Sequence, residues 1–112
     1  MADGEKKDGG KLRWGLLPWH ALKVVVEVLE FGAKKYSPDN WKRVTDAQAR
    51  YKEALGRHVA EFMMGHWRDG ESGLPVLGHV VCNALYLLWF DQTDQRATTL
   101  ARAMGKLPLF DK

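Results

Sequence analysis

Apolar and polar residues alternate along most of the chain with the spacing of helices. Over residues 19–35, apolar side chains recur every three or four positions, which places them on one helix face. Residues 45–68 repeat the pattern with a similar spacing. Residues 76–90 are almost wholly apolar, and residues 94–104 are amphipathic. These patterns predict an all-α fold of four helices, with residues 76–90 at the centre of the packing.

Proline, glycine and small polar residues mark the breaks between these segments. Residues 36–40 contain a proline beside Asp and Asn, which favours a turn. Residues 69–75 contain two glycines and a proline, which is typical of a loop. Residues 1–10 are charged and glycine-rich, and we interpret them as a flexible tail. We therefore expect one domain over residues 11–112.

Composition narrows the class of protein. The 112 residues are 46% hydrophobic and 28% charged, so the chain can build a core and should not be disordered. The formal net charge of +3 is too small to argue for nucleic-acid binding by itself. A single cysteine, Cys82, excludes an intramolecular disulfide framework and fits a reducing cytoplasm. No signal peptide is visible, and no apolar run reaches the ~18–20 residues of a membrane span. We expect a small cytoplasmic domain without a membrane segment.

Two carboxylates stand in an otherwise apolar stretch of the first predicted helix. Glu27 and Glu30 are three residues apart, so both project from the same helix face. Their apolar neighbours suggest half-burial, which would raise at least one pKa unless a divalent cation such as Mg²⁺ bound there. The alternative is a two-faced helix whose acids simply point outward, and the sequence weighs the two interpretations about equally.

The third predicted helix contains a second polar pair. His79 and Asn83 are four residues apart and are nearly the only polar groups between residues 76 and 90. Buried polar groups need partners, and a lone His–Asn pair in a core helix is more often structural. If the pair faced Glu27 and Glu30, however, the four side chains would form a polar pocket of the kind that helix bundles use for metals and ligands.

The second predicted helix and the following loop offer further ligands. His58 and Glu61 share a helix face and can add a metal ligand or a proton carrier. A solvated face with an ordinary salt bridge is the alternative. Asp69 and Glu71 lie in a glycine-containing loop that either lines a ligand pocket or forms only a turn before the next helix.

Cations and aromatic residues cluster on both sides of the first predicted helix. Lys and Arg bind phosphates, and Trp or Tyr can stack on a base. Surface lysines and core tryptophans are the simpler interpretation of each residue alone. With the acids, they indicate a site for a metal and a polyphosphate. The members of this group are Lys11, Arg13, Trp14, Lys34, Lys35, Tyr36, Asn40 and Trp41.

Six short blocks follow one another along residues 11–90. They are residues 11–18 (KLRWGLLP), 27–36 (EVLEFGAKKY), 40–41 (NW), 57–58 (RH), 71–75 (ESGLP) and 79–85 (HVVCNAL). Together these blocks resemble the phage dATP/dGTP diphosphohydrolase family, which groups with the MazG-like all-α nucleoside triphosphate pyrophosphohydrolases. Variants called MazZ serve phages that replace adenine with 2-aminoadenine. Each block alone is weak, but the ordered set is specific.

The resemblance implies a MazG-like four-helix bundle that hydrolyses dGTP, and dATP as well, to the monophosphate and pyrophosphate. It implies two or more Mg²⁺ or Mn²⁺ ions held by an ExxE motif and an ExxD motif. Glu27 and Glu30 match the first motif. The second departs from the pattern, because Asn83 stands at the usual Asp and His79 or Val80 at the usual Glu. His58, Glu61, Asp69 or Glu71 is then expected to supply what the second motif lacks.

The resemblance also implies roles for the remaining site residues. The candidate metal ligands are Glu27, Glu30, His79, Asn83, His58 and Glu61. The candidate catalytic carboxylates are Glu27, Glu30 and Glu71, and substitution of Glu27 or Glu30 by Ala is expected to remove nearly all activity. The candidate substrate-binding residues are Lys11, Arg13, Trp14, Lys34, Lys35, Asn40, Trp41, Arg57, Asp69 and Glu71.

Two expectations concern partners. A chain of this length would struggle to cover an apolar central helix and enclose a nucleotide, so we expect a homodimer or homotetramer, as the resemblance also implies. A non-enzymatic helical module that binds DNA or protein is the rival interpretation. It explains the basic composition and the Trp content, but it does not explain acids and a His–Asn pair among apolar residues.

Overall fold

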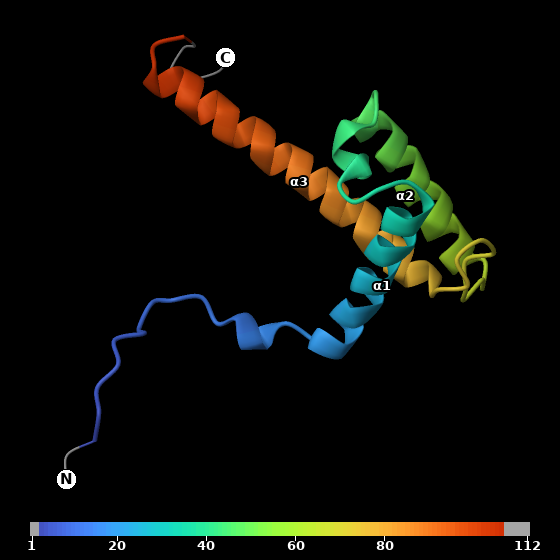
Figure 1. Ribbon diagram of the computed structural model, residues 1–112, viewed down its shortest axis with the longest axis horizontal. Coiled ribbons are helices and arrows are strands. Elements are labelled where there is room, and N and C mark those ends of the chain that lie inside the picture. The colour runs from blue at the N-terminus through green and yellow to red at the C-terminus, as the bar shows by residue number, and fades with distance from the viewer. Residues whose placement is uncertain (1–2, 107–112) are drawn as a thin grey trace.

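The computed structural model describes residues 3–106, which form helices and connecting segments (Figure 1). The elements in chain order are η1 (Trp14–Leu16), α1 (Trp19–Lys35), η2 (Asn40–Arg43), α2 (Ala47–Met63) and α3 (Val76–Ala103). The described residues contain no strand, only one isolated bridge between Arg68 and Pro75. The predicted all-α class is confirmed. The domain limits of 11–112 stay a prediction, since residues 1–2 and 107–112 lie outside the described residues.

The helix boundaries agree with the sequence for α1 and differ further along the chain. α2 ends at Met63, so the loop before α3 starts earlier than predicted. The third and fourth predicted helices are one 28-residue helix, and the prediction of four separate helices is wrong. No Gly or Pro stands between residues 90 and 94, so nothing stops the helix where its apolar character fades. Within residues 3–106, no helix is both long enough and apolar enough to cross a membrane.

The first half of α3 is the centre of the packing, as predicted. It lies against both α1 and α2, while its second half extends beyond them (Figure 1). Val25 and Val28 of α1 pack against Cys82, which is 1% exposed. Gly78 permits this close approach, because a Cβ at that position would lie 2.8 Å from a methyl carbon of Val24.

A group of aromatic rings ties η2 to α2 and α3. The ring of Trp41 stacks on Tyr86 with centroids 4.4 Å apart, and Tyr51 tilts against Tyr86 at 4.9 Å. The Tyr51 hydroxyl donates a hydrogen bond to the backbone oxygen of Trp41 at 2.9 Å. These contacts fix the segment after α1 beside the first half of α3. They also complete one wall of the hollow described next.

Candidate functional site

A hollow of about 1220 Å³ lies between α1, η2, α2, the loop before α3 and the first half of α3. Each of these parts contributes polar or charged side chains to the lining, and aromatic residues form one wall. Its charged and histidine residues are Glu30, Lys35, Asp39, Arg50, Arg57, His58, Glu61, Asp69, Glu71 and His79. Most of the residues that the sequence selected are therefore brought together here.

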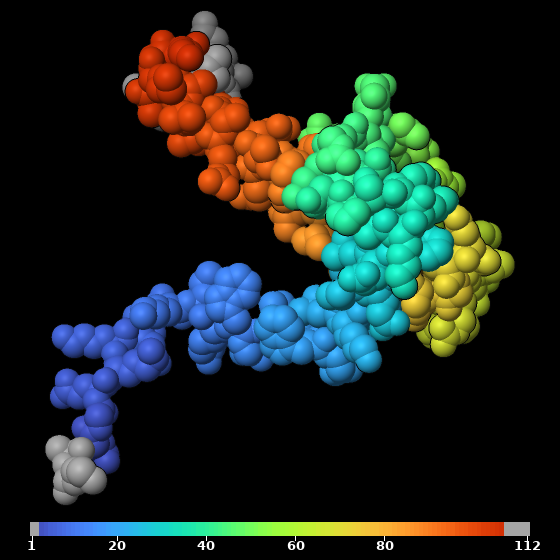
Figure 2. Space-filling model, in the orientation of Figure 1, coloured from blue at the N-terminus to red at the C-terminus, as the bar shows by residue number. Residues whose placement is uncertain are grey.

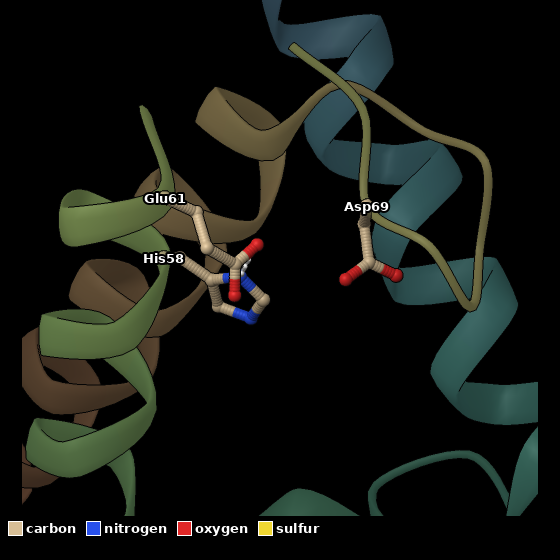
Figure 3. Close-up of side chains that lie close together, drawn as sticks. All are labelled: His58, Glu61 and Asp69. Atoms are coloured by element: carbon tan, nitrogen blue, oxygen red, sulfur yellow. Dashed lines mark ion pairs between the residues drawn. The ribbon is translucent and has the colours of Figure 1, made fainter. Parts of the chain in front are cut away.

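Three of these residues form a compact group of potential metal ligands. One ligand atom each from His58, Glu61 and Asp69 lie within 4.8 Å of one another. His58 and Glu61 project from successive turns of α2 toward the loop segment that carries Asp69 (Figure 3). The distance from His58 Nδ1 to Glu61 Oε2 is 3.7 Å. The sequence placed His58 and Glu61 on one helix face, and the structure confirms that geometry.

An unpaired nitrogen indicates that this group fits a cation. His58 Nδ1 is buried and has no hydrogen-bond partner among the described residues. Buried polar atoms are nearly always paired, so such an atom calls for an explanation. An imidazole nitrogen beside two carboxylates is a donor set that divalent transition metals accept. The residues present therefore fit the divalent cation that the sequence led us to expect.

The loop before α3 holds the Asp69 side chain in place. Asp69 Oδ2 accepts hydrogen bonds from the backbone N–H groups of Ser72 at 2.8 Å and Glu71 at 3.1 Å. Burial alone would raise the pKa of Asp69, but the hydrogen bonds from Ser72 and Glu71 and the nearby His79 ring outweigh it. The pKa of this carboxyl consequently lies below its usual value, which keeps Asp69 ionised and ready to bind a cation.

Gly73 and Arg68 close the same loop. Gly73 has a φ of 71°, in the left-handed region that favours glycine, and its N–H donates to the backbone oxygen of Asp69 at 2.9 Å. Arg68 donates from Nη1 to the backbone oxygen of Gly73 at 2.9 Å. The loop is thus internally bonded around Asp69, rather than being only a linker between two helices.

Ser72 lies in the loop that the sequence offered as a pocket lining, but the sequence alone assigned it no role in the site. Its Oγ lies 2.7 Å from His79 Nε2 and accepts the backbone N–H of Leu74 at 3.1 Å. Burial lowers the pKa of His79, which favours a neutral ring whose Nε2 can accept a hydrogen bond from the Ser72 hydroxyl. The His79 ring also stacks on His58 at 4.8 Å. The available signal was the Asp69-x-x-Ser72 spacing, which is typical of side chain-to-backbone turns.

Comparison with known proteins identifies the family. The model of the family described as "dATP/dGTP diphosphohydrolase, N-terminal" matches residues 1–99. The chain belongs to this family. No curated protein and no solved structure matches the chain.

The acid pair of this dATP/dGTP diphosphohydrolase family member lies differently from the expectation. Both Glu27 and Glu30 are exposed, which agrees with the alternative of outward-pointing acids and not with half-burial. The reason is that α1 packs on α3 through Val25 and Val28, and the two acids lie on other sides of the helix. Glu30 lines the hollow, whereas Glu27 does not. Their roles as metal ligands stay predictions.

The polar pair of α3 is buried as expected. His79 is 9% exposed and Asn83 is 7% exposed. The Asn83 amide donates to the backbone oxygen of His79 at 2.8 Å, within the same helix. Both residues line the hollow, but they do not face Glu27 across it, because Glu27 lies outside. Whether Asn83 binds a metal stays a prediction.

The predicted phosphate-binding cations divide into two groups. Lys35 and Arg57 line the hollow, and Lys35 forms an ion pair with Glu71. That ion pair raises the pKa of Lys35. Lys34 is exposed on α1 and is not among the residues of the lining. Lys11 and Arg13 are exposed on the segment before α1, also away from the hollow.

The predicted base-binding residues divide in the same way. Asn40 and Trp41 line the hollow, but one face of Trp41 is already covered by Tyr86. Lys42 Nζ lies 5.3 Å from the centre of the Trp41 ring. Trp14 is 67% exposed on the segment before α1 and does not line the hollow. Within this chain, Trp41 and Asn40 are therefore better placed than Trp14 to contact a bound ligand.

Proposed function

We propose that this chain hydrolyses dGTP, and dATP as well, to the deoxynucleoside monophosphate and pyrophosphate with the help of a divalent cation. One observation carries the proposal: His58, Glu61 and Asp69 converge in the hollow of a chain that belongs to the dATP/dGTP diphosphohydrolase family. The proposed setting is a phage nucleotide pool that supports synthesis of DNA containing 2-aminoadenine.

The donor set favours Mn²⁺ over Mg²⁺ at this group. Mg²⁺ prefers oxygen ligands, whereas Mn²⁺ also accepts an imidazole nitrogen more readily. His58 would supply the nitrogen, with Glu61 and Asp69 supplying carboxylate oxygens. Glu30 and Glu71 line the same hollow and are the proposed ligands for a further ion. Glu27, His79 and Asn83 remain additional candidates.

The charge of the hollow supports a need for the cation. Its lining contains five carboxylates but only three Lys or Arg side chains, so a triphosphate would meet a net negative surface. When bound, a divalent cation neutralises phosphate charge and activates water. Lys35 and Arg57 would attract the phosphates, and the hydrogen bonds around Asp69 would keep that carboxylate oriented. Asn40 and the edge of Trp41 would contact the base.

A substrate panel with product identification tests the proposal. The chain is incubated with each deoxynucleoside triphosphate and Mn²⁺, and the products are separated by chromatography. We expect dGMP and dAMP with pyrophosphate, and a strong loss of both in the Asp69→Asn variant. A diphosphate with free phosphate would indicate a phosphatase instead. No turnover by a folded chain supplied with Mn²⁺ or Mg²⁺ would contradict the proposal.

Thermal melting separates the enzyme from the rival helical module. A ligand that binds only the folded chain stabilises it by RT ln(1 + [L]/Kd), about 2.7 kcal/mol at a hundredfold excess over Kd. We expect Mn²⁺ and dGTP to raise the melting temperature. The His66→Ala variant is the control and should show the same rise as the wild type, because His66 is exposed and lies outside the hollow. If neither ligand shifts melting, the module interpretation is favoured.

A further inference from the structure

Charged residues stand at both ends of the α2 face that lines the hollow. Four residues follow one another there at spacings of four, three and four, which places them on one side of the helix: Arg50, Ala54, Arg57 and Glu61. At 1.5 Å per residue, this face spans about 16 Å. Glu61 belongs to the group of candidate metal ligands, and Arg57 lies one turn before it. Arg50 stands about two turns further away, at the other end, and no role was assigned to it from the sequence.

Two ring contacts between α2 and α3 fix what each end of the hollow contains. The His58 ring stacks on His79 with centroids 4.8 Å apart, and the Tyr51 ring lies 4.9 Å from the Tyr86 ring. Within each helix the two rings are seven residues apart, so the two contacts are separated by about 10 Å along the helices. One end of the hollow therefore holds the candidate metal ligands, and the other end holds aromatic rings.

The aromatic end has the composition of a site for a purine. η2 lies beside the first turns of α2, as the space-filling view shows (Figure 2). Asn40, Trp41 and Val44 line the hollow here, and the bond from the Tyr51 hydroxyl to the backbone oxygen of Trp41 fixes this wall. Sites for small molecules are mostly apolar, with a few polar groups that set the orientation of the ligand. A nucleotide with its phosphates at the metal end would reach this wall with its base.

Arg50 brings hydrogen-bond donors to the aromatic end. It precedes Tyr51 on α2 and is exposed. Its Nη1 donates to the backbone oxygen of Thr45 at 3.4 Å, which is a long bond, and a guanidinium carries five N–H donors. Most of these donors are therefore available to a ligand. The carboxylate of Asp39, which also lines the hollow, is instead paired with Lys42 Nζ at 3.1 Å.

We propose that Arg50 binds the O6 and N7 edge of guanine and makes the chain prefer dGTP over dATP. Guanine presents two acceptors at that edge, and they match the fork of N–H donors of an arginine. Adenine presents N7 but has an amino donor in place of O6, so one of the two bonds is lost. The inference rests on the proposed function, because it places the triphosphate at the metal group, and it adds the residue that selects the base.

Nucleotides altered at single positions of the base test this assignment. Pyrophosphate release with Mn²⁺ is measured for dGTP, dATP, dITP and 7-deaza-dGTP, which has a carbon in place of N7. We expect kcat/KM for dGTP to exceed the values for dATP and 7-deaza-dGTP by at least about tenfold, since charged hydrogen bonds to a base discriminate by that much. dITP keeps O6 and N7 and lacks only the amino group, so it should behave like dGTP.

The Arg50→Ala variant should abolish this discrimination. In the variant, kcat/KM for dGTP should fall to the values for dATP and 7-deaza-dGTP, because no fork of donors is left to distinguish the bases. Arg50→Lys keeps the charge without the fork and should lose most of the preference. The control is Lys52→Ala, which removes an exposed cation of α2 outside the hollow and should keep the wild-type ratios.

Two results would overturn the assignment of Arg50 and leave the proposed hydrolysis standing. One is an equal kcat/KM for dGTP and 7-deaza-dGTP in the wild type. The other is a loss in Arg50→Ala that is the same for both nucleotides, which would place Arg50 on the phosphates or the sugar. If the chain hydrolyses no nucleotide, the proposed function fails, and titration calorimetry then measures the same ratios as Kd values. Equal Kd values, or no binding, would overturn the assignment of Arg50 as well.

Discussion

Ser72 Oγ and His79 Nε2 lie 2.7 Å apart, and this contact ties the loop that carries Asp69 to the buried face of α3. On the other side, the His79 ring stacks on His58. The two contacts link the loop, α3 and α2 through side chains that surround the candidate metal ligands. His79 therefore acts as a support for His58 and Asp69, whether or not it binds a metal itself.

Removal of the Ser72 hydroxyl should loosen the candidate metal site. The Ser72→Ala variant keeps its backbone N–H, which donates to Asp69, but it loses the contact with His79 and the acceptor for the Leu74 N–H. Partners that orient metal ligands typically contribute about 10–100-fold to metal affinity. We predict a fall of that size in Mn²⁺ affinity by titration calorimetry, measured at a temperature at which the metal-free variant keeps its helical circular dichroism. Thr93→Ala, on the exposed second half of α3, is the matched control. Unchanged Mn²⁺ affinity would contradict this support role.

The two acids of α1 should differ in importance. Glu30 lines the hollow and Glu27 does not, although both are exposed. We predict that Glu30→Ala lowers the rate of pyrophosphate release more than Glu27→Ala does, measured at saturating Mn²⁺. Both variants should fold, because neither side chain belongs to the core. Equal and nearly complete loss in both would show that Glu27 also reaches the ion, as the ExxE resemblance implies.

The preference of the site for Mn²⁺ over Mg²⁺ should depend on the imidazole nitrogen of His58. A donor set with one imidazole favours Mn²⁺, and an all-oxygen set favours Mg²⁺. We predict that His58→Asp lowers the ratio of activity with Mn²⁺ to activity with Mg²⁺. His66→Asp, an exposed change outside the hollow, should leave the ratio as in the wild type. If His58→Asp kept the wild-type ratio at measurable activity, His58 would not be a ligand.

The Cys82 thiol should be protected in the folded chain. Cys82 is only 1% exposed. This burial raises the pKa of its thiol above the usual value of 9.0. We predict that a disulfide reagent at pH 8 modifies Cys82 at least about 100-fold more slowly than it modifies the denatured chain, because the fold must open first. Rapid modification of the folded chain would contradict the packing of α1 on α3.

The same burial gives a pH dependence of stability. Above pH 9 the unfolded chain releases the thiol proton while the folded chain retains it, so the free energy of unfolding falls as pH rises. Tyr51 and Tyr86 also have raised pKa values through burial and contribute in the same direction. We predict that Cys82→Ala makes this alkaline slope shallower but does not remove it. Denaturant unfolding between pH 8 and 10.5 measures the slope, and an unchanged slope would contradict a protonated buried thiol.

The pattern of apolar residues predicted the helices, but it did not predict how they pack against one another. The apolar spacing of residues 19–35 predicted α1, because one helix face must meet the core, and the proline-containing turn at residues 36–40 predicted where it ends. The continuity of α3 was missed, since fading apolarity does not end a helix without Gly or Pro. Which face of α1 is buried depends on how it packs against α3, so the exposure of Glu27 and Glu30 did not follow from their apolar neighbours.

The candidate site was predictable only where its residues lie on the same helix. His58 and Glu61 are on one helix, so their spacing alone placed them together. Asp69 joins them because the loop packs on α3 through the contact between Ser72 and His79, and the His79 ring stacks on His58 of α2. The spacing of residues along the sequence does not determine these contacts. The sequence named Asp69 as a candidate but gave it no position relative to His58. The segment before α1 was expected to bind the phosphates, but its residues Lys11, Arg13 and Trp14 do not line the hollow.

Hydrolysis of dGTP in water enriched in oxygen-18 tests the central claim most directly. The proposal has water attack the α-phosphorus while the bond from that phosphorus to pyrophosphate breaks. With wild-type chain and Mn²⁺, mass spectrometry of the products should find one labelled oxygen in dGMP and none in pyrophosphate, and Asp69→Asn should form little of either product. Label in pyrophosphate, or formation of dGDP with labelled phosphate, would contradict the account.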